Sequence, residues 1–314
     1  MWKTFVWEDI EKCKISLMKI TILIPVYNDW QSLTKLIDEI NGLSIGPDFQ
    51  ISIVIVNDAS NHDRQDEDKD FKNIHSIKIL NMKINQGHAR CIATGLKYIY
   101  EKEDFDYIIP MDGDGEDRPE EIEKFLNQIN NSNNKPIVGE RIKRSENLLF
   151  KACYQIHKLV TLTFTGKSIK FGNFTCLPKL TVEKLINEKA TWNSFSGALK
   201  KIENDIISVP SIRGTRYFGP SKMSFKNLIK HSLSIISVFR KTVLIRSALF
   251  IVLYILLIKS NASIITSLPL IMVLIMVYFI SNLALRENID ELDNSLNNID
   301  LSLIHISEPT RPRL

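Results

Sequence analysis

Short apolar runs alternate with stretches of helical periodicity along the first part of this chain. The apolar runs are rich in β-branched residues and fall at 20–25, 51–56, 77–80, 107–111 and 136–138. Between them, apolar residues recur at helical spacing in 30–40 and 89–100. Strands that alternate with helices are typical of parallel βαβ units joined by right-handed crossovers. We therefore predict an α/β fold with a mostly parallel sheet flanked by helices.

The second part of the chain changes from a mixed pattern to an apolar one. Residues 141–241 contain a basic amphipathic helix near 148–164 and a short strand near 206–209. We expect them to complete a site that the first part begins, on the side where a second substrate, the acceptor, would bind. Residues 264–285 form an almost uncharged run of about 22 residues, enough to cross a bilayer. The run before it reaches about 17 residues when counted from Thr242 with Arg246 extending to the interface. This pattern predicts a transmembrane helical hairpin.

These changes divide the chain into an N-terminal extension at 1–19, a catalytic domain at 20–241, two transmembrane helices at 242–286 and a disordered polar tail at 287–314. Charged residues interrupt the first 14 positions, so no signal-peptide core is expected there. Basic residues flank the hairpin and are sparse between its helices. The predicted protein is therefore integral to the membrane, with its catalytic domain in the cytoplasm.

Composition narrows the classes of partner. The net charge is only +4, and the basic residues do not form runs interleaved with aromatic residues, which argues against nucleic-acid binding. A polyanionic or membrane-surface partner fits better. The four cysteines lie far apart without a Cys-x-x-Cys pair, so neither a zinc site nor a disulfide framework is indicated.

Polar segments follow several of the predicted strands, at 27–29, 57–60, 85–87 and 112–114. Ligands of open parallel sheets bind beyond the carboxyl ends of the strands, where these segments lie. Asp112 and Asp114 alternate with glycines directly after an apolar strand. Two such carboxylates can hold a hard cation, Mg²⁺ or Mn²⁺, that leaves positions open for substrate phosphates. The simpler alternative is a solvated acidic turn.

The order and spacing of segments 22–29, 56–60, 85–87 with Gly95, and 111–120 resemble glycosyltransferase family 2. Within that family the chain is most similar to polyprenyl-phosphate glycosyltransferases, through residues 138–141, 213–216 and 219–222 and the apolar hairpin. The resemblance implies the glycosyltransferase A-type fold, inversion at the anomeric carbon, and an undecaprenyl or dolichyl phosphate acceptor. It favours a UDP-sugar donor, leaves a GDP-sugar and a homo-oligomer open, and suggests a role in cell-envelope glycan synthesis.

The same resemblance assigns roles by position. Asp58 would contact the base or ribose, although Asn57 stands where relatives carry the other acid of a pair. Asp112 and Asp114 would hold the metal, with Glu116 as a further ligand. We also expect Arg141 to reach the acceptor phosphate and the helix opened near Gly87 to face an anion. The residues that would line the nucleoside are Pro25, Tyr27, Asn28 and Asp29.

A cationic segment follows the late strand and is expected to close over phosphates. Arg213, Arg216 and Lys222 lie there, with Ser221 and two glycines. Arginine offers phosphate paired hydrogen-bond donors, so these residues are predicted to clamp donor and acceptor. The alternative is a basic patch that attracts anionic lipid head groups.

The sequence also bears on the acceptor. A metal held by Asp112 and Asp114 would stabilise the charge that develops on the leaving phosphate. A sugar hydroxyl would additionally need a general base, and the corresponding segment, 191–197, contains no acid. A lipid phosphate is already anionic, which favours it as the acceptor. Glu203 and Asp205 are the nearest acids, so transfer to a hydroxyl of a glycan or lipid-linked saccharide stays a second hypothesis. The third hypothesis is a catalytically silent membrane protein that binds a nucleotide sugar.

Overall fold

A single mixed sheet forms the centre of the computed structural model, which describes residues 17–62, 71–143, 148–219 and 224–306. Its eight strands lie in the order β7-β5-β6-β4-β1-β2-β3-β8. Among the described strands, β6 and β8 run opposite to the rest. The strands are β1 Met18–Val26, β2 Phe49–Asn57, β3 Ile74–Met82, β4 Tyr107–Pro110, β5 Ile137–Lys143, β6 Thr175–Pro178, β7 Ile207–Ile212 and β8 Ile299–Ile306.

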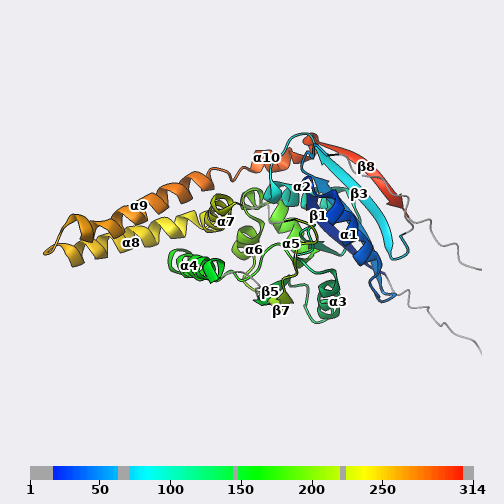
Figure 1. The fold of residues 1–314 in the computed structure, drawn as a ribbon, viewed down its shortest axis with the longest axis horizontal. Helices are drawn as coiled ribbons and strands as arrows, with labels where there is room; N and C mark the ends of the chain where they lie inside the picture. The colour runs from blue at the N-terminus through cyan, green and yellow to red at the C-terminus, as the bar shows by residue number, and fades with distance from the viewer. Residues whose placement is uncertain (1–16, 63–70, 144–147, 220–223, 307–314) are drawn as a thin grey trace, which may run out of the picture.

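Helices cover the sheet and extend from it at one end (Figure 1). The helices of the α/β body are α1 Trp30–Asn41, α2 His88–Lys102, α3 Ile122–Ile129, α5 Lys179–Ile186 and α6 Phe195–Ile202, with 3-10 turns at Pro119–Glu121 and Lys189–Trp192. The others are α4 Leu148–Thr165, α7 Phe225–Ser237, α8 Arg240–Ile258, α9 Ile264–Ala284 and α10 Ile289–Asp293, followed by a 3-10 turn at Ser295–Asn298.

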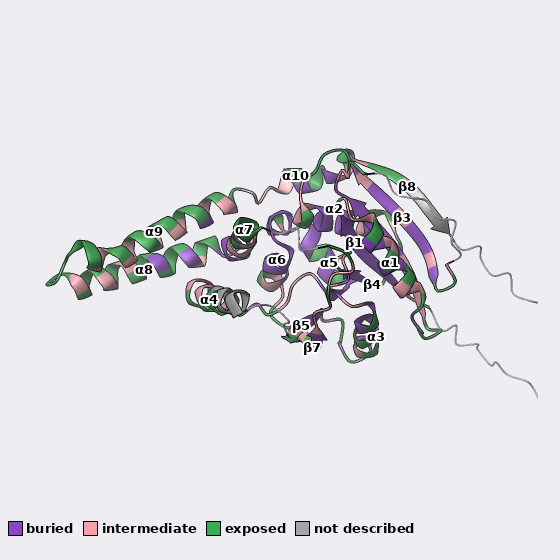
Figure 2. Cartoon of the chain, in the orientation of Figure 1, coloured by how far each residue is buried: buried purple, intermediate pink, exposed green. Residues whose placement is uncertain are grey.

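The central strands are buried on both faces, as Figure 2 shows for the middle of the sheet. Ile22 and Ile24 of β1 belong to one apolar cluster, while Leu23 between them belongs to another on the opposite face. This arrangement explains why the strands read as continuous apolar runs rather than alternating ones. On the second face, α2 packs so closely that a Cβ atom on Gly95 would lie 2.3 Å from Leu23 Cδ1.

The predicted α/β fold with a mostly parallel sheet is confirmed, and each predicted strand and helix of residues 20–138 is present. Two strands, β6 and β8, escape the sequence pattern. The four-residue β6 lies antiparallel between β4 and β5. Because β6 is so short, it carries too little periodicity to be recognised. β1 also begins at Met18, inside the segment expected to be an extension.

Helices α8 and α9 occupy the segment expected as a hairpin and pack against each other while extending away from the sheet (Figure 1). Both are long and apolar enough to cross a membrane. Most of their large apolar side chains are exposed in the isolated chain, including Ile245, Leu257, Ile264 and Ile265. Arg246 of α8 donates from Nη1 to the Thr163 carbonyl, 2.9 Å away, which joins the base of the hairpin to α4.

The expectation of a disordered tail is wrong for residues 289–306. After α9 the chain returns to the sheet, forms α10, and adds β8 antiparallel to β3. Leu292 of α10 is fully buried, and the Trp192 indole donates to Glu291 Oε2 at 2.6 Å. The polar composition predicted disorder, but this segment pairs with the open edge of β3 and buries an apolar side chain. Residues 307–314 lie outside the described part of the chain.

Candidate active site at the carboxyl ends of the strands

The loops after β1, β2 and β3 meet at one edge of the sheet, with Asp58 at their junction. Its main-chain N–H donates to the Val26 carbonyl at 2.9 Å. Its carboxylate accepts from the main-chain N–H groups of Gln86, at 2.7 Å, and Gly87, at 2.9 Å. With only 4% of its surface exposed, Asp58 ties the loops together. Its predicted contact with base or ribose stays a prediction, and the main-chain N–H of Gly87, the N-cap of α2, is already bound to Asp58.

The predicted nucleoside-binding loop is closely joined to the loop after β2. Asn28 adopts a left-handed conformation with φ of 51°, and its side-chain oxygen accepts from Asn61 N at 3.0 Å. Its own N–H donates to Ser60 Oγ at 2.9 Å. Tyr27 is 47% exposed, whereas Pro25 is buried within β1. Tyr27 therefore has the free surface that a nucleoside contact needs, and Pro25 can contribute only through its main chain.

The acidic residues after β4 form a compact loop. The main-chain N–H of Asp112 donates to Asp117 Oδ2 at 2.9 Å, and that of Glu116 donates to Asp114 Oδ1 at 3.0 Å. Gly115 has a φ of 88°, a conformation that L side chains rarely adopt. The alternation of acids and glycines thus produces a tight turn at the end of the strand.

The segment after β7 lies directly on this acidic loop. The N–H of Tyr217 donates to the Asp114 carbonyl at 2.9 Å, and that of Gly214 donates to the Glu116 carbonyl at 2.8 Å. A Cβ atom on Gly115 would lie 2.7 Å from the Tyr217 ring. The cationic segment predicted to clamp phosphates is therefore held against the predicted metal ligands by main-chain hydrogen bonds.

The arginines of that segment pair with the carboxylates. Arg216 bridges two loops, because its Nη1 lies 2.5 Å from Asp114 Oδ2 and its Nη2 lies 2.7 Å from Asp29 Oδ2. Arg213 forms an ion pair with Glu116. Both predicted clamp residues thus lie in the site, and Asp29 joins them. Ser221 and Lys222 lie outside the described residues.

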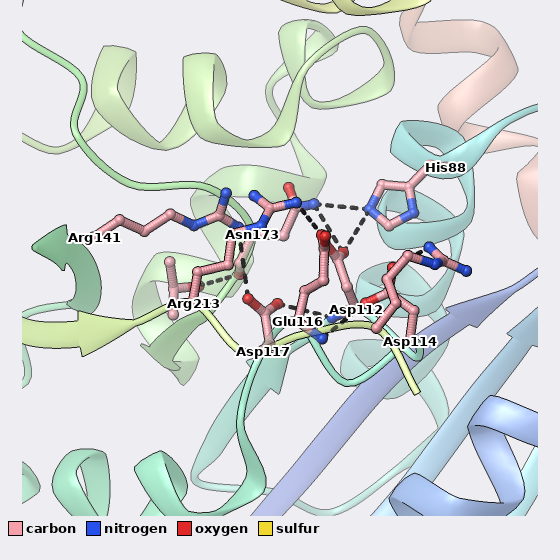
Figure 3. A network of polar contacts seen from close by, with 10 residues as sticks. His88, Asp112, Asp114, Glu116, Asp117, Arg141, Asn173 and Arg213 are labelled. Carbon is pink, nitrogen blue, oxygen red and sulfur yellow. Dashed lines mark hydrogen bonds and ion pairs between the residues drawn. The ribbon is translucent and has the colours of Figure 1, made fainter. Parts of the chain in front are cut away.

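Burial and neighbouring charges shift the pKa values of Asp112 and Asp117, which lie side by side in Figure 3, in opposite directions. Burial, together with the neighbouring Asp112, raises the pKa of Asp117 to about 7, although Arg141 at 3.6 Å opposes the shift. Burial alone would raise the pKa of Asp112 too, but His88 and then Arg141 outweigh it and hold that pKa below its usual value. Asp112 is therefore the more firmly ionised of the two.

Sequence reasoning missed three residues of this cluster. Asp117 Oδ2 accepts from the main-chain N–H of Asp112. His88 places Nε2 3.2 Å from Asp112 Oδ1. Asn173, just before β6, places Nδ2 3.3 Å from the same oxygen. His88 directly follows the polar segment 85–87, which was a usable signal, whereas Asn173 follows a helix whose return to the sheet was not predicted.

The donor chemistry of Asp112 and Asp114 fits a hard divalent cation. Within the described residues, no group of three or more His, Cys, Asp or Glu side chains is placed to hold a metal on its own. Mg²⁺ commonly takes one or two carboxylates and completes its shell with water and substrate phosphates. The site therefore suits a cation shared with a phosphate ligand. Glu116, predicted as a further ligand, is engaged by Arg213.

The chain matches a protein family and is similar in sequence to known proteins. The pattern described as "Glycosyl transferase family 2" matches residues 21–184. Two curated proteins from strains of Klebsiella pneumoniae, each named undecaprenyl-phosphate 4-deoxy-4-formamido-L-arabinose transferase, are 25% identical over 220 residues. The match covers 67% of this chain and spans 64% of the length of those relatives.

The fold is also similar to a solved structure, Staphylococcus aureus TarS 1-349 in complex with UDP-GlcNAc. The similarity covers 90% of this chain and 89% of the TarS chain, with a TM-score of 0.50 and 12% sequence identity. At that identity the comparison supports the α/β fold alone.

Proposed function

Because the chain belongs to glycosyltransferase family 2, we propose that it transfers a sugar from a nucleotide donor to a polyprenyl phosphate at the cytoplasmic membrane face, with inversion at the anomeric carbon. The observation that carries the proposal is the meeting of Asp112, Asp114 and three arginines at the carboxyl edge of the sheet. The names of the two curated relatives support the choice of a lipid phosphate as acceptor.

The donor half of the proposal rests on the loops after β1, β2 and β4. A divalent cation held by Asp112 and Asp114 would offset the charge that develops on the leaving phosphate. Arg216 already lies within reach of Asp29 and Asp114, so its guanidinium is close to where that phosphate would have to sit. Guanidinium groups match phosphate oxygens with two parallel donors. A UDP-sugar is the favoured donor and a GDP-sugar the alternative.

The acceptor half rests on the arginines and on where the remaining acids lie. Arg141, on β5, is mostly buried beside Asp117. Glu203 is held by Lys184 at 2.9 Å and Asp205 by Lys135 at 3.3 Å.

Asp205 and Lys135 precede β7 and β5, two strands that run in the same direction, so their pair lies at the sheet edge opposite the site. Asp205 is therefore not placed to serve as a base for a sugar hydroxyl, and Glu203 is already paired with Lys184, whereas an anionic phosphate needs no base.

The membrane location in the proposal rests on the hairpin and its surroundings. α8 and α9 carry exposed apolar side chains along their length, and Phe225 and Ile229 of the preceding helix α7 are exposed as well. Lipid is the solvent in which such side chains are stable. A cysteine introduced at Ser260, between the helices, should react with a membrane-impermeant maleimide added outside intact cells. Labelling that requires permeabilised cells would contradict the proposed topology.

The decisive experiment supplies membranes containing the full chain with a panel of labelled UDP- and GDP-sugars. We expect the label to move into an extractable lipid and to be released by mild acid, because a sugar phosphate is acid-labile. Nuclear magnetic resonance of the product should give an anomeric configuration opposite to that of the donor. A product with a glycosidic bond to a sugar hydroxyl would favour the saccharide-extending alternative, and no transfer with any donor would favour the silent binding protein.

A further inference from the structure

Two side chains without a part in the proposed transfer, His88 and Asn173, meet the Asp112 carboxylate (Figure 3). His88 Nε2 lies 3.2 Å and Asn173 Nδ2 3.3 Å from Asp112 Oδ1. The two nitrogens lie 2.8 Å from each other, and His88 donates to Oδ1 in the form that carries the proton on Nε2. Three segments far apart in the sequence therefore converge on one oxygen of a predicted metal ligand.

The main chain alone does not fix this carboxylate. Met111 N donates to the Leu23 carbonyl at 3.0 Å and Asp112 N donates to Asp117 Oδ2 at 2.9 Å, which places the Cα atom. Two side-chain torsions remain free to turn the carboxylate. The contacts of His88 and Asn173 with Oδ1 restrict those torsions. Within the described part of the chain, no hydrogen bond to Oδ2 competes for that oxygen.

Both supports are themselves firmly held. The buried Thr175, on β6, donates from Oγ1 to the Asn173 carbonyl at 3.2 Å, and Gly139 N donates to the next carbonyl, that of Phe174, at 3.0 Å. His88 is the first residue of α2, directly after Gly87, whose N–H is bound by the buried Asp58. Neither side chain therefore depends on a freely moving loop.

We propose that Asn173 and His88 are positioning residues that hold the Asp112 carboxylate by Oδ1 and leave Oδ2 to the divalent cation. This inference rests on the metal role in the proposed function. Partners that orient metal ligands are needed for full metal affinity, and the proposed function gives the cation two protein carboxylates, those of Asp112 and Asp114.

The test measures Mn²⁺ binding to the full chain in detergent, from the electron paramagnetic resonance signal of free Mn²⁺. Asn173→Ala and His88→Ala should each raise the Mn²⁺ dissociation constant about 10- to 100-fold, the usual effect of losing an orienting partner. Transfer activity should fall at limiting Mn²⁺ and recover at saturating Mn²⁺. His88→Gln keeps a terminal amide that can donate to Asp112, so it should restore most of the affinity.

Asn187→Ala is the matched control, since Asn187 donates to the Glu183 carbonyl on the surface of α5, away from the site. It should bind Mn²⁺ like the parent chain. Dissociation constants within about twofold of the parent for both Asn173→Ala and His88→Ala would overturn the inference. If Asn173→Ala fails to fold, the comparison of His88→Ala with His88→Gln decides. Unchanged Mn²⁺ binding in Asp112→Asn would instead overturn the metal role itself, which separates the two failures.

Discussion

At the scale of single residues, the site combines carboxylates and guanidinium groups that satisfy one another. Asp114 binds Arg216, and Glu116 binds Arg213. Each carboxylate that a cation would need is therefore already close to a positive charge. A divalent cation and a phosphate can enter together with little change in net charge, because the guanidinium groups can turn from carboxylate to phosphate. In the proposed function, such an exchange would explain why the predicted metal ligands and the predicted phosphate ligands lie in contact.

The first prediction concerns the two aspartates. Asp112→Asn and Asp114→Asn should each lower transfer by at least about a hundredfold, because each removes a ligand charge from the metal site, where even indirect partners are worth 10- to 100-fold. Main-chain hydrogen bonds hold their loop, and asparagine keeps the shape of each side chain, so the thermal unfolding temperature should change little. Asp205→Asn is the control, since its side chain is 78% exposed at the opposite edge of the sheet. Normal turnover in either site variant would contradict the metal assignment.

The second prediction separates a phosphate clamp from a lipid-docking patch at Arg216. Charge-assisted hydrogen bonds contribute about 1.5 to 3 kcal/mol, so Arg216→Ala should lower kcat/KM roughly ten- to a hundredfold. Arg216→Lys should recover little, because a lysine cannot bridge Asp114 and Asp29 with a planar fork. The same loss is expected for Lys222→Ala.

The assay for Arg216 uses detergent and a short water-soluble prenyl phosphate, which removes the leaflet and keeps the chemistry. A basic residue that only docks on lipid is worth about 1 kcal/mol near an anionic leaflet and nothing without one. Full activity of Arg216→Ala under these conditions would show that the loop docks on lipid. A persistent loss would support the clamp.

At the scale of elements, the position of the site follows from how α2 and β6 pack. α2 lies flat on β1 because Gly95 has no side chain, and this brings His88, at the start of the helix, over the end of β4. β6 pairs antiparallel with β4 and β5, so Asn173, two residues before it, faces the same strand end. The helix and the strand thus deliver the two supports of Asp112.

The third prediction tests this close packing. Gly95→Ala should lower the thermal unfolding temperature, because its Cβ atom would lie 2.3 Å from the Leu23 side chain, which is itself fully buried. Overpacking of this kind costs about 1 to 3 kcal/mol, which exceeds the gain of about 1 kcal/mol from replacing glycine in a helix. Gly42→Ala is the matched control, since its Cβ atom would meet nothing closer than 3.5 Å. An unfolding temperature equal to that of the parent chain would show that α2 can shift without cost.

At the scale of the whole molecule, the chain leaves the α/β body as a hairpin and returns to it. Glu291 of α10 accepts from Trp192, and Asp293 pairs with Lys97 of α2 at 2.8 Å. Leu292, between them, is fully buried. The return joins the trailing end of the hairpin to the helix that carries His88. Both ends of the hairpin are therefore anchored to the same body, which fits a topology with both ends on one side of the membrane.

The fourth prediction tests whether the returning segment docks. Leu292→Ala should lower stability by about 2 to 5 kcal/mol, the usual range for emptying a buried leucine site. Leu301→Ala is the matched control in the same segment, because Leu301 is exposed and should leave the unfolding temperature nearly unchanged. Equal effects of the two substitutions, measured by thermal unfolding in detergent, would contradict the docking of α10.

The sequence by itself determined the α/β class, the parallel strands, the apolar hairpin and the acidic loop after β4. Each of these depends on local properties, namely the periodicity of apolar residues and the residue types that follow a strand. Asp112, Asp114, Arg213 and Arg216 could therefore be chosen without coordinates. Their grouping at one edge followed from the parallel direction of β4 and β7, because parallel strands end on the same side.

The tertiary structure alone decided which side chains touch. Asp58 binds main-chain N–H groups of the loop after β3, and β8 returns to β3 through pairings that join residues far apart in the chain. Asn173 and His88 lie 85 residues apart and meet only because β6 and α2 pack beside the same strand end. No local pattern records such contacts, since the free energy that selects them comes from burial and hydrogen bonding between distant segments.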